Sequence, residues 1–188
     1  MRNNKVDPEN VDQKLFELFS RLGYDGTSME LLSQATGLKK ASLYHRFPHG
    51  KQEMAQHVLS IVEQWIVDHI VTVLADKTMV PARRLKKAVS SLDVLYNGGT
   101  SNCLLRTLTV GPDAGVFREG VTNCFKLITQ SFTDIAIELG LSENEARKKA
   151  HLINPLLQGS LVLSGATGDS THFKDCLANI PVLLQVSN

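Results

Sequence analysis

The chain has 188 residues, of which 43% are hydrophobic and 21% charged, a composition typical of a soluble globular protein. Its formal net charge is only +1, so a nucleic-acid site has to be argued from local charge. No apolar run approaches the roughly 20 residues of a membrane span, no apolar segment follows the basic N-terminus, and the three cysteines are too widely spaced for a disulfide framework, so we expect a cytoplasmic protein with no membrane segment.

Apolar residues recur with helical spacing along the chain, and no segment alternates like a strand. Pro8, after the capping residue Asp7, favours a helix start because a first helical position needs no N–H partner. Thr27 and Glu30 have the spacing of a capping box, in which Thr27 caps the second helix. Gly37 suits a tight turn that requires positive φ.

We therefore predict an all-α fold. A long helix that starts at Lys51 has some 25 residues and would span roughly 37 Å, enough to connect a small N-terminal module to a larger core. The sequence therefore divides into a small N-terminal module over residues 1–50 and a larger helical domain over residues 51–188. The expected helices cover about 8–22, Thr27 to Ala35, Lys39 or Lys40 to His45, 51–76, Pro81 to Tyr96, 101–110, 117–139, 143–163, and a last helix from Phe173 to Leu183.

Two short helices joined by a glycine turn, behind a supporting helix, form a helix-turn-helix. The second of these helices fits the major groove of DNA, where base edges can be read. The segment from Lys39 to Lys51 contains no acidic residue, as phosphate neutralisation requires. Its basic residues are Lys39, Lys40, Arg46 and Lys51, with donors added by His45 and His49. The alternative is a structural helical hairpin with a solvated basic face.

Residues 15–51 contain Gly23-Tyr24, Thr27-Ser28, Ala35-Thr36-Gly37-Leu38 and the run Lys40-Ala41-Ser42-Leu43-Tyr44-His45-Arg46-Phe47-Pro48 before Gly50-Lys51. With these residues the segment closely resembles the DNA-binding domain of TetR-family regulators. The rest of the chain resembles that family in architecture only. The segment from Phe47 to Lys51 and the run Asn102-Cys103-Leu104-Leu105 resemble those of a subgroup of the family that controls multidrug or aromatic-compound efflux.

The resemblance implies roles for individual residues. It places Thr27 and Ser28 at phosphate, Lys40, Ala41 and Ser42 at bases, Tyr44 and His45 at the DNA backbone, and Lys51 at phosphate, with Leu43 and Phe47 in the core. A lysine can address guanine, and an alanine methyl can pack on a thymine methyl. Lys39 stands where the family often has a capping serine, and it joins the predicted DNA-binding set through its charge.

Candidates for an effector pocket lie further along the chain: Trp65, His69, Tyr96, Cys103, Phe117 and Phe125. Aromatic residues at helical spacing are usually core, and in this family core and pocket share the same helices. Cys103 is interpreted as a buried small hydrophobe rather than a redox sensor. The second basic cluster, Arg83-Arg84 with Lys86-Lys87, is interpreted as a solvated helix face. Pro48 separates His45 from His49 and no third ligand is evident, so we predict no metal site.

The chain contains no G-x-G-x-x-G, G-x-S-x-G or H-E-x-x-H motif, and we expect neither catalytic residues nor a cofactor. The resemblance implies that residues 1–50 form a helix-turn-helix DNA-binding domain and that residues 51–188 form a helical ligand-binding and dimerisation domain. It also implies a homodimer that binds operator DNA, acts most often as a repressor, and is released by a small-molecule effector. Its dimer interface would use helices near 117–139 and 143–165, with Ala136 and Gly159-Ser160 allowing close approach. The alternatives are a helical small-molecule-binding protein whose helix-turn-helix no longer binds DNA, and an enzyme with an undetected site.

Overall fold

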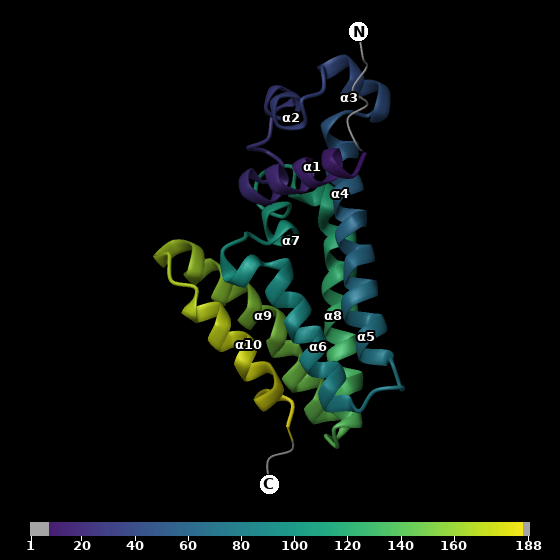
Figure 1. The fold of residues 1–188 in the computed structure, drawn as a ribbon, viewed down its shortest axis with the longest axis vertical. Coiled ribbons are helices and arrows are strands. Elements are labelled where there is room, and N and C mark those ends of the chain that lie inside the picture. The colour runs from purple at the N-terminus through teal and green to yellow at the C-terminus, as the bar shows by residue number, and fades with distance from the viewer. Residues whose placement is uncertain (1–7, 186–188) are drawn as a thin grey trace. The chain divides into compact units, whose positions relative to one another are not determined.

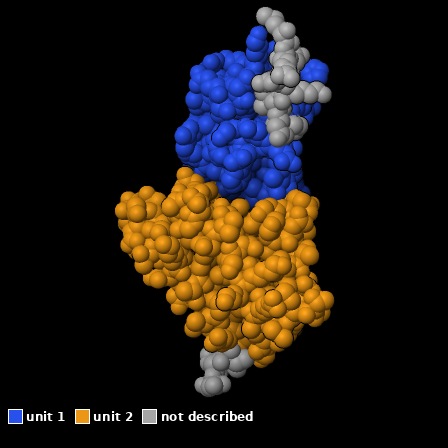
Figure 2. Space-filling view, in the orientation of Figure 1, with its two compact units in different colours: residues 1–62, 104–121 blue, residues 63–103, 122–188 orange. Residues whose placement is uncertain are grey.

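The structure, a computed structural model, describes residues 8–185, and its secondary structure over these residues is entirely helical (Figure 1). The predicted all-α fold is thereby confirmed. The predicted capping residue Asp7 lies outside the described residues. The chain forms two compact units (Figure 2): unit 1 combines Met1–Val62 with Leu104–Val121, and unit 2 combines Glu63–Cys103 with Thr122–Asn188.

The helices follow most of the predicted boundaries. Unit 1 contains α1 (Pro8–Leu22), α2 (Met29–Thr36), α3 (Lys40–Arg46), α7 (Leu104–Thr107) and a 3-10 turn over Ala114–Phe117. Unit 2 contains a π-helical turn over Val67–Val71, α5 (Thr72–Ala75), α6 (Pro81–Leu95), a 3-10 turn over Asn97–Gly99, α9 (Glu143–Thr167) and α10 (Thr171–Leu183). Both units receive residues from α4 (Lys51–Ile66) and α8 (Arg118–Glu138).

Two sequence expectations need correction. The helix expected over 101–110 is only the four residues of α7, because a bend and non-helical residues precede it and a turn follows it. The long helix from Lys51 is continuous to Ala75, but it is not α-helical throughout. Its backbone hydrogen bonds change from the α-helical to the π-helical pattern over Val67–Val71. The two compact units divide the chain after Val62, Cys103 and Val121, and not at residue 50. The predicted division into a DNA-binding domain and a ligand-binding domain therefore stays a prediction about function.

Unit 1 joins α7 to the helix-turn-helix region. The hydroxyl of Thr107 donates a 3.1 Å hydrogen bond to the carbonyl of Phe19, in the last turn of α1. Gly23 has φ +69°, and a Cβ at this position would lie 2.8 Å from the carbonyl oxygen of Thr107. A glycine is therefore needed at residue 23 both for its backbone conformation and for the close approach of α7.

The stretch Lys51–Ala75 is long and apolar enough, by length and composition alone, to cross a membrane. The sequence expectation of no such segment rested on Asp68 and His69, which interrupt the apolar run. In the structure 39% of the most apolar window is buried inside the protein, and Met54, Val58 and Ile70 are fully covered. Because core helices of soluble proteins pass the same test, the stretch carries no membrane assignment.

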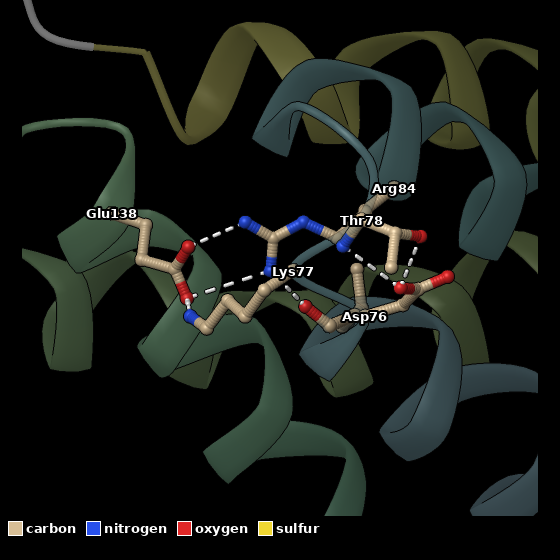
Figure 3. Close-up of polar contacts among 6 residues, drawn as sticks. Asp76, Lys77, Thr78, Arg84 and Glu138 are labelled. Carbon is tan, nitrogen blue, oxygen red and sulfur yellow. Dashed lines mark hydrogen bonds and ion pairs between the residues drawn. The ribbon is translucent and has the colours of Figure 1, made fainter.

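Unit 2 contains a buried arginine that the sequence placed on a solvated face. Arg84 is 2% exposed, and its guanidinium donates to the carbonyl of Leu74 and to the carboxylate of Glu138 (Figure 3). Lys77 donates to the same carboxylate. The hydrogen bond from Arg84, and to a smaller extent the one from Lys77, lowers the pKa of Glu138 to about 2. Arg83, Lys86 and Lys87 are exposed as predicted, so the correction concerns Arg84 alone.

Candidate nucleic-acid interface

The amino end of α2 is capped by Ser28, one residue later than predicted. The Ser28 hydroxyl accepts a 3.2 Å hydrogen bond from the N–H of Leu31. Thr27 is 1% exposed, and its hydroxyl donates to the carbonyl of Gly23 at 2.6 Å. The Thr27 hydroxyl therefore holds the loop before α2 and is not presented to a phosphate, whereas Ser28 is exposed.

The turn between α2 and α3 is held by side chains that sequence reasoning did not single out. Gly37 adopts the left-handed conformation, with φ 68° and ψ 9°, as predicted for the turn. Ser33 donates to the carbonyl of Leu38 at 2.6 Å, and the Thr36 hydroxyl donates to the carbonyl of Leu32 at 2.7 Å. Serine and threonine near a helix end often bond local backbone groups, and that tendency was the available signal.

The short helix α3 has one buried face and one exposed face. Leu43 is fully buried and Phe47 is 5% exposed, which confirms both as core residues. Lys39 precedes α3 without a side-chain capping bond, as expected from its departure from serine. Exposed residues surround Leu43 along and just before the helix: Lys39, Lys40, Ala41, Ser42, Tyr44 and His45. The structure thus brings six of the nine predicted DNA-binding residues to one exposed segment.

Two of the basic residues near α3 are already paired. The Lys40 ammonium lies 2.6 Å from the Glu30 carboxylate, and both side chains are more than half exposed. Arg46 lies 3.1 Å from Asp12 of α1, and its guanidinium sits over the Phe47 ring. Exposed ion pairs contribute only about 0–1 kcal/mol, so Lys40 can exchange Glu30 for another acceptor at small cost.

Lys51 is half-buried, and its ammonium bonds within unit 1. It donates a 3.0 Å hydrogen bond to the carbonyl of Tyr24 and lies 3.9 Å from the centroid of the Tyr24 ring. The ring of Phe117 packs edge-on against the Tyr24 ring, with 4.9 Å between the two ring centroids. Phe117, a predicted pocket residue, is 1% exposed in the core of unit 1, whereas the other five pocket candidates belong to unit 2. Phe117 therefore packs in the core of unit 1, and its predicted role in an effector pocket stays a prediction.

Two pocket candidates meet in unit 2. The Tyr96 hydroxyl donates to the Cys103 sulfur at 3.4 Å, and the Gln158 amide donates to the same sulfur at 3.4 Å. Cys103 is 2% exposed, as expected for a small buried hydrophobe. Burial is the main reason that the pKa of Tyr96 lies well above its ordinary value. The buried Oε1 atom of Gln158 has no hydrogen-bond partner among the described residues, and sequence reasoning did not select this residue.

The remaining candidates lie apart from this cluster. Trp65 and His69 stack on one another at 4.5 Å, with ring planes 8° apart, and His69 is exposed. Phe125 lines an open cavity of about 700 Å³ formed by α8 and α9, together with Asn154 and His151. This cavity does not include Tyr96 or Cys103 in its lining.

Comparisons with known proteins agree with this geometry. Residues 14–58 match the model of bacterial regulatory proteins of the tetR family. The chain is 26% identical over 172 residues to the HTH-type transcriptional regulator YxaF of Bacillus subtilis (strain 168), covering 89% of this chain and 90% of that protein. It is 24% identical over 173 residues to the HTH-type transcriptional regulator LmrA of the same organism, covering 87% and 90%.

Solved structures share the fold over nearly the whole chain. A TetR transcriptional regulator from Legionella pneumophila superposes with a TM-score of 0.80 at 20% identity, covering 97% of both chains. The CifR cysteine mutant, solved in complex with 26bp double-strand operator DNA, superposes with a TM-score of 0.70 at 19% identity, covering 97% of this chain and 98% of that chain. The protein is therefore a helix-turn-helix DNA-binding transcriptional regulator. It belongs to the TetR family.

Proposed function

We propose that this regulator is a homodimeric repressor that acts in the cytoplasm, binds operator DNA through α2 and α3, and releases it when a small-molecule effector binds unit 2. The observation that carries the proposal is the division of α3 into a buried Leu43 and an exposed segment of polar and basic residues. A buried anchor fixes the orientation of the helix, and the exposed segment is free to enter a major groove.

In the proposed complex, Lys40, Ala41 and Ser42 contact base edges. The exposed side chains of Ser28, Lys39, Tyr44 and His45 contact the DNA backbone, and Lys51 contributes a phosphate contact beyond its bond to Tyr24. Backbone contacts set register and strengthen binding at low salt, whereas base contacts set specificity. Thr27 is not part of the proposed contact set, because its hydroxyl is buried and bonded to Gly23.

An apolar stripe on α9 supports the homodimer. Leu152 and Leu156 are 49% and 47% exposed, and Leu163 is 49% exposed. Their spacing of four and then seven residues, with the exposed Gly159 between them, places them on one helix face. Coiled-coil seams have this spacing, and a second copy of the stripe would cover it. Ile137 adds an exposed apolar side chain on α8.

Two of the small residues expected at the dimer interface face the chain's own interior. Ala136 is fully buried, and Ser160 is 8% exposed with its hydroxyl bonded to the carbonyl of Leu157. Gly159 alone of that set is exposed, and a Cβ built on it meets nothing within 4 Å. The proposed interface therefore keeps the two helices but shifts its contacts to the leucine stripe.

The buried polar cluster of Tyr96, Cys103 and Gln158 is the proposed effector site in unit 2. An unpartnered buried amide oxygen costs about 1–3 kcal/mol, and a ligand donor would recover that cost. Trp65, His69 and Phe125 remain candidates for further ligand contacts. Coupling between effector and operator of about 1–3 kcal/mol is typical of allosteric proteins. The continuous helix from Lys51 to Ala75, which supplies residues to both units, is the proposed connection.

The test is fluorescence anisotropy of the purified protein on the DNA immediately upstream of its own gene, with scrambled DNA and a salt titration. We expect sequence-selective binding that weakens steeply with salt and falls at least tenfold in Lys40→Ala and Tyr44→Ala. Lys174→Ala, an exposed lysine of α10 in unit 2, is the matched control and should bind normally. Weak binding that ignores sequence on every tested DNA would favour a small-molecule-binding protein that no longer recognises an operator.

A further inference from the structure

Unit 1 contains a cleft of about 270 Å³ that the helix-turn-helix does not use. One wall is the end of α1 with the loop before α2, from Arg21 to Gly26. The other wall is α7 with the segment that follows it, from Arg106 to Pro112. We call it the Arg21–Arg106 cleft. A water molecule occupies about 30 Å³ of liquid volume, so the cleft has room for roughly nine waters or one small organic molecule.

The two guanidinium groups of this cleft have no carboxylate partner among the residues that the structure describes. Neither Arg21 nor Arg106 makes a side-chain hydrogen bond or an ion pair with any of residues 8–185, and Arg21 acts on Glu17 only through its charge. By contrast, Arg46, Arg84 and Arg147 each pair with a carboxylate. Asp25 is the acidic residue of the lining, so the formal charge of the cleft is positive.

The backbone adds one further donor. The N–H group of Gly26, in the lining, donates no hydrogen bond to any part of the chain that the structure describes, whereas Gly111 lies directly against the carboxylate of Asp25. Guanidinium and amide N–H groups together form the donor set that a carboxylate accepts from, and the guanidinium geometry allows a bidentate contact. The donors of the cleft therefore suit an oxyanion.

The rest of the lining is apolar and accessible. Leu22 is 38% exposed and Val110 is 60% exposed, and Pro112 completes this part of the wall. A bare inorganic anion would leave these side chains in water. A ligand that has one carboxylate and a compact apolar body would cover them while it pairs with the arginines.

We infer that the Arg21–Arg106 cleft binds a small organic carboxylate with a compact apolar body. The site belongs wholly to unit 1 and is separate from the Tyr96–Cys103–Gln158 cluster, so the inference does not rest on the proposed repressor function. The loop that forms one wall leads directly into Ser28, the cap of α2. The occupant would therefore contact the segment that positions the DNA-binding helices.

The probe for the test is 1-naphthoate, with 1-naphthamide as its uncharged counterpart, added to the ¹⁵N-labelled full-length protein. We expect saturable shifts of the backbone amides of Gly23, Gly26 and Gly111, which line the cleft, at millimolar naphthoate or below. Gly165 and Gly168 of unit 2 should not move, and naphthamide should bind at least fivefold more weakly. No saturable shift in the three cleft glycines, or equal binding of acid and amide, would overturn the inference.

Substitution identifies the groups responsible. Arg21→Gln and Arg106→Gln should each weaken naphthoate at least fivefold, because each removes one charged donor. Arg83→Gln, an exposed arginine of α6 outside the cleft, is the matched control and should bind as the parent does. The melting temperature of each variant checks that it folds, and Arg106→Lys, which keeps the charge, should retain intermediate affinity. Unchanged affinity in both glutamine variants would refute the assignment.

Discussion

The ammonium of Lys51 donates a 3.0 Å hydrogen bond to the carbonyl of Tyr24 while lying 3.9 Å from the centroid of the same residue's ring. One side chain thereby joins the start of α4 to the loop before α2. The ring of Tyr24 is in turn packed edge-on by Phe117. Lys51 was expected to contact phosphate. In the structure it also stabilises unit 1 through these two contacts with Tyr24, which we call the Lys51–Tyr24 contact.

These two roles of Lys51 predict different responses to substitution. Lys51→Met should lower the stability of the fold by about 1–2 kcal/mol through the lost hydrogen bond and cation–π contact. It should also lower the salt dependence of operator binding by about 0.9 in the log–log slope, because one phosphate contact is lost. Urea unfolding and anisotropy at several salt concentrations measure the two effects separately.

Tyr24→Leu is the matched control, because it tests only the structural contact between Lys51 and the Tyr24 ring. It removes the ring under the ammonium but leaves Lys51 charged, so stability should fall while the salt slope of DNA binding stays unchanged. If Lys51→Met left the salt slope at its parental value, Lys51 would be a structural residue and not a phosphate contact.

The Glu30–Lys40 ion pair predicts that operator binding is restrained by a carboxylate. Glu30→Gln should tighten DNA binding about threefold to tenfold, because it releases the Lys40 ammonium and removes a negative charge near the phosphates. The hydrogen bond from Lys40 lowers the pKa of Glu30 below its ordinary value, so the carboxylate is ionised at neutral pH. Glu143→Gln breaks a similar exposed pair with Arg147 in unit 2 and should leave the affinity unchanged. Weaker binding by Glu30→Gln would contradict the prediction.

The helix-turn-helix could be predicted from sequence because its signals are local. The apolar spacing, Gly37 and Pro48 lie within a few residues of the features they specify. The capping register was wrong by one residue because Thr27 and Ser28 are adjacent hydroxyl residues with the same capping chemistry. Which of them caps depends on backbone angles, and Ser28 has the extended φ and ψ of a capping residue.

Features that depend on distant partners could not be predicted. Arg84 is separated from Glu138 by 54 residues, and nothing in the charged sequence around Arg84 identifies that partner. Phe117 has the spacing of a core residue, but only the fold shows that its neighbour is Tyr24. Small residues were assigned to the dimer interface without knowledge of the helix rotation, which turns Ala136 and Ser160 inward and leaves Gly159 exposed.

The Arg84–Glu138 pair predicts a component of acid sensitivity. The pKa of Glu138 is lowered to about 2 in the fold, so its contribution to stability is present above the ordinary value of 4.5 and is lost as pH falls toward 2. Glu138→Gln should lower the free energy of unfolding by about 1–3 kcal/mol at pH 7, because it leaves the buried Arg84 guanidinium without its charged partner. The loss is limited because position 138 is partly exposed to water.

Urea unfolding of the parent and of Glu138→Gln between pH 7 and pH 3 measures this effect. The difference in stability between the two proteins should shrink as the pH falls below 4.5. Asp93→Asn, an exposed residue of α6, should not change stability at either pH. A difference that stays constant down to pH 3 would show that the carboxylate charge does not stabilise the fold.

The leucine stripe of α9 predicts the oligomeric state. Leu156→Glu should convert a dimer to a monomer in analytical ultracentrifugation, because a charge at the centre of the stripe would be buried without a partner. Operator affinity should fall at least tenfold, since the two reading helices would no longer be linked. Val94→Glu, at a residue of α6 that is 79% exposed, is the matched control and should remain dimeric. A parental protein that sediments as a monomer would exclude the proposed interface.

The unpartnered amide oxygen of Gln158 predicts that this residue serves ligand binding rather than folding. Gln158→Met keeps similar volume and removes a buried acceptor that nothing in the described chain satisfies, so the unfolding free energy should be unchanged or higher by up to about 2 kcal/mol. The same variant should reduce the response of operator binding to any effector found by screening. Tyr96→Phe is the companion variant, because it removes the hydroxyl that donates to Cys103. A loss of more than about 1 kcal/mol in Gln158→Met would mean that the bond to the Cys103 sulfur stabilises the core and that the cluster is structural.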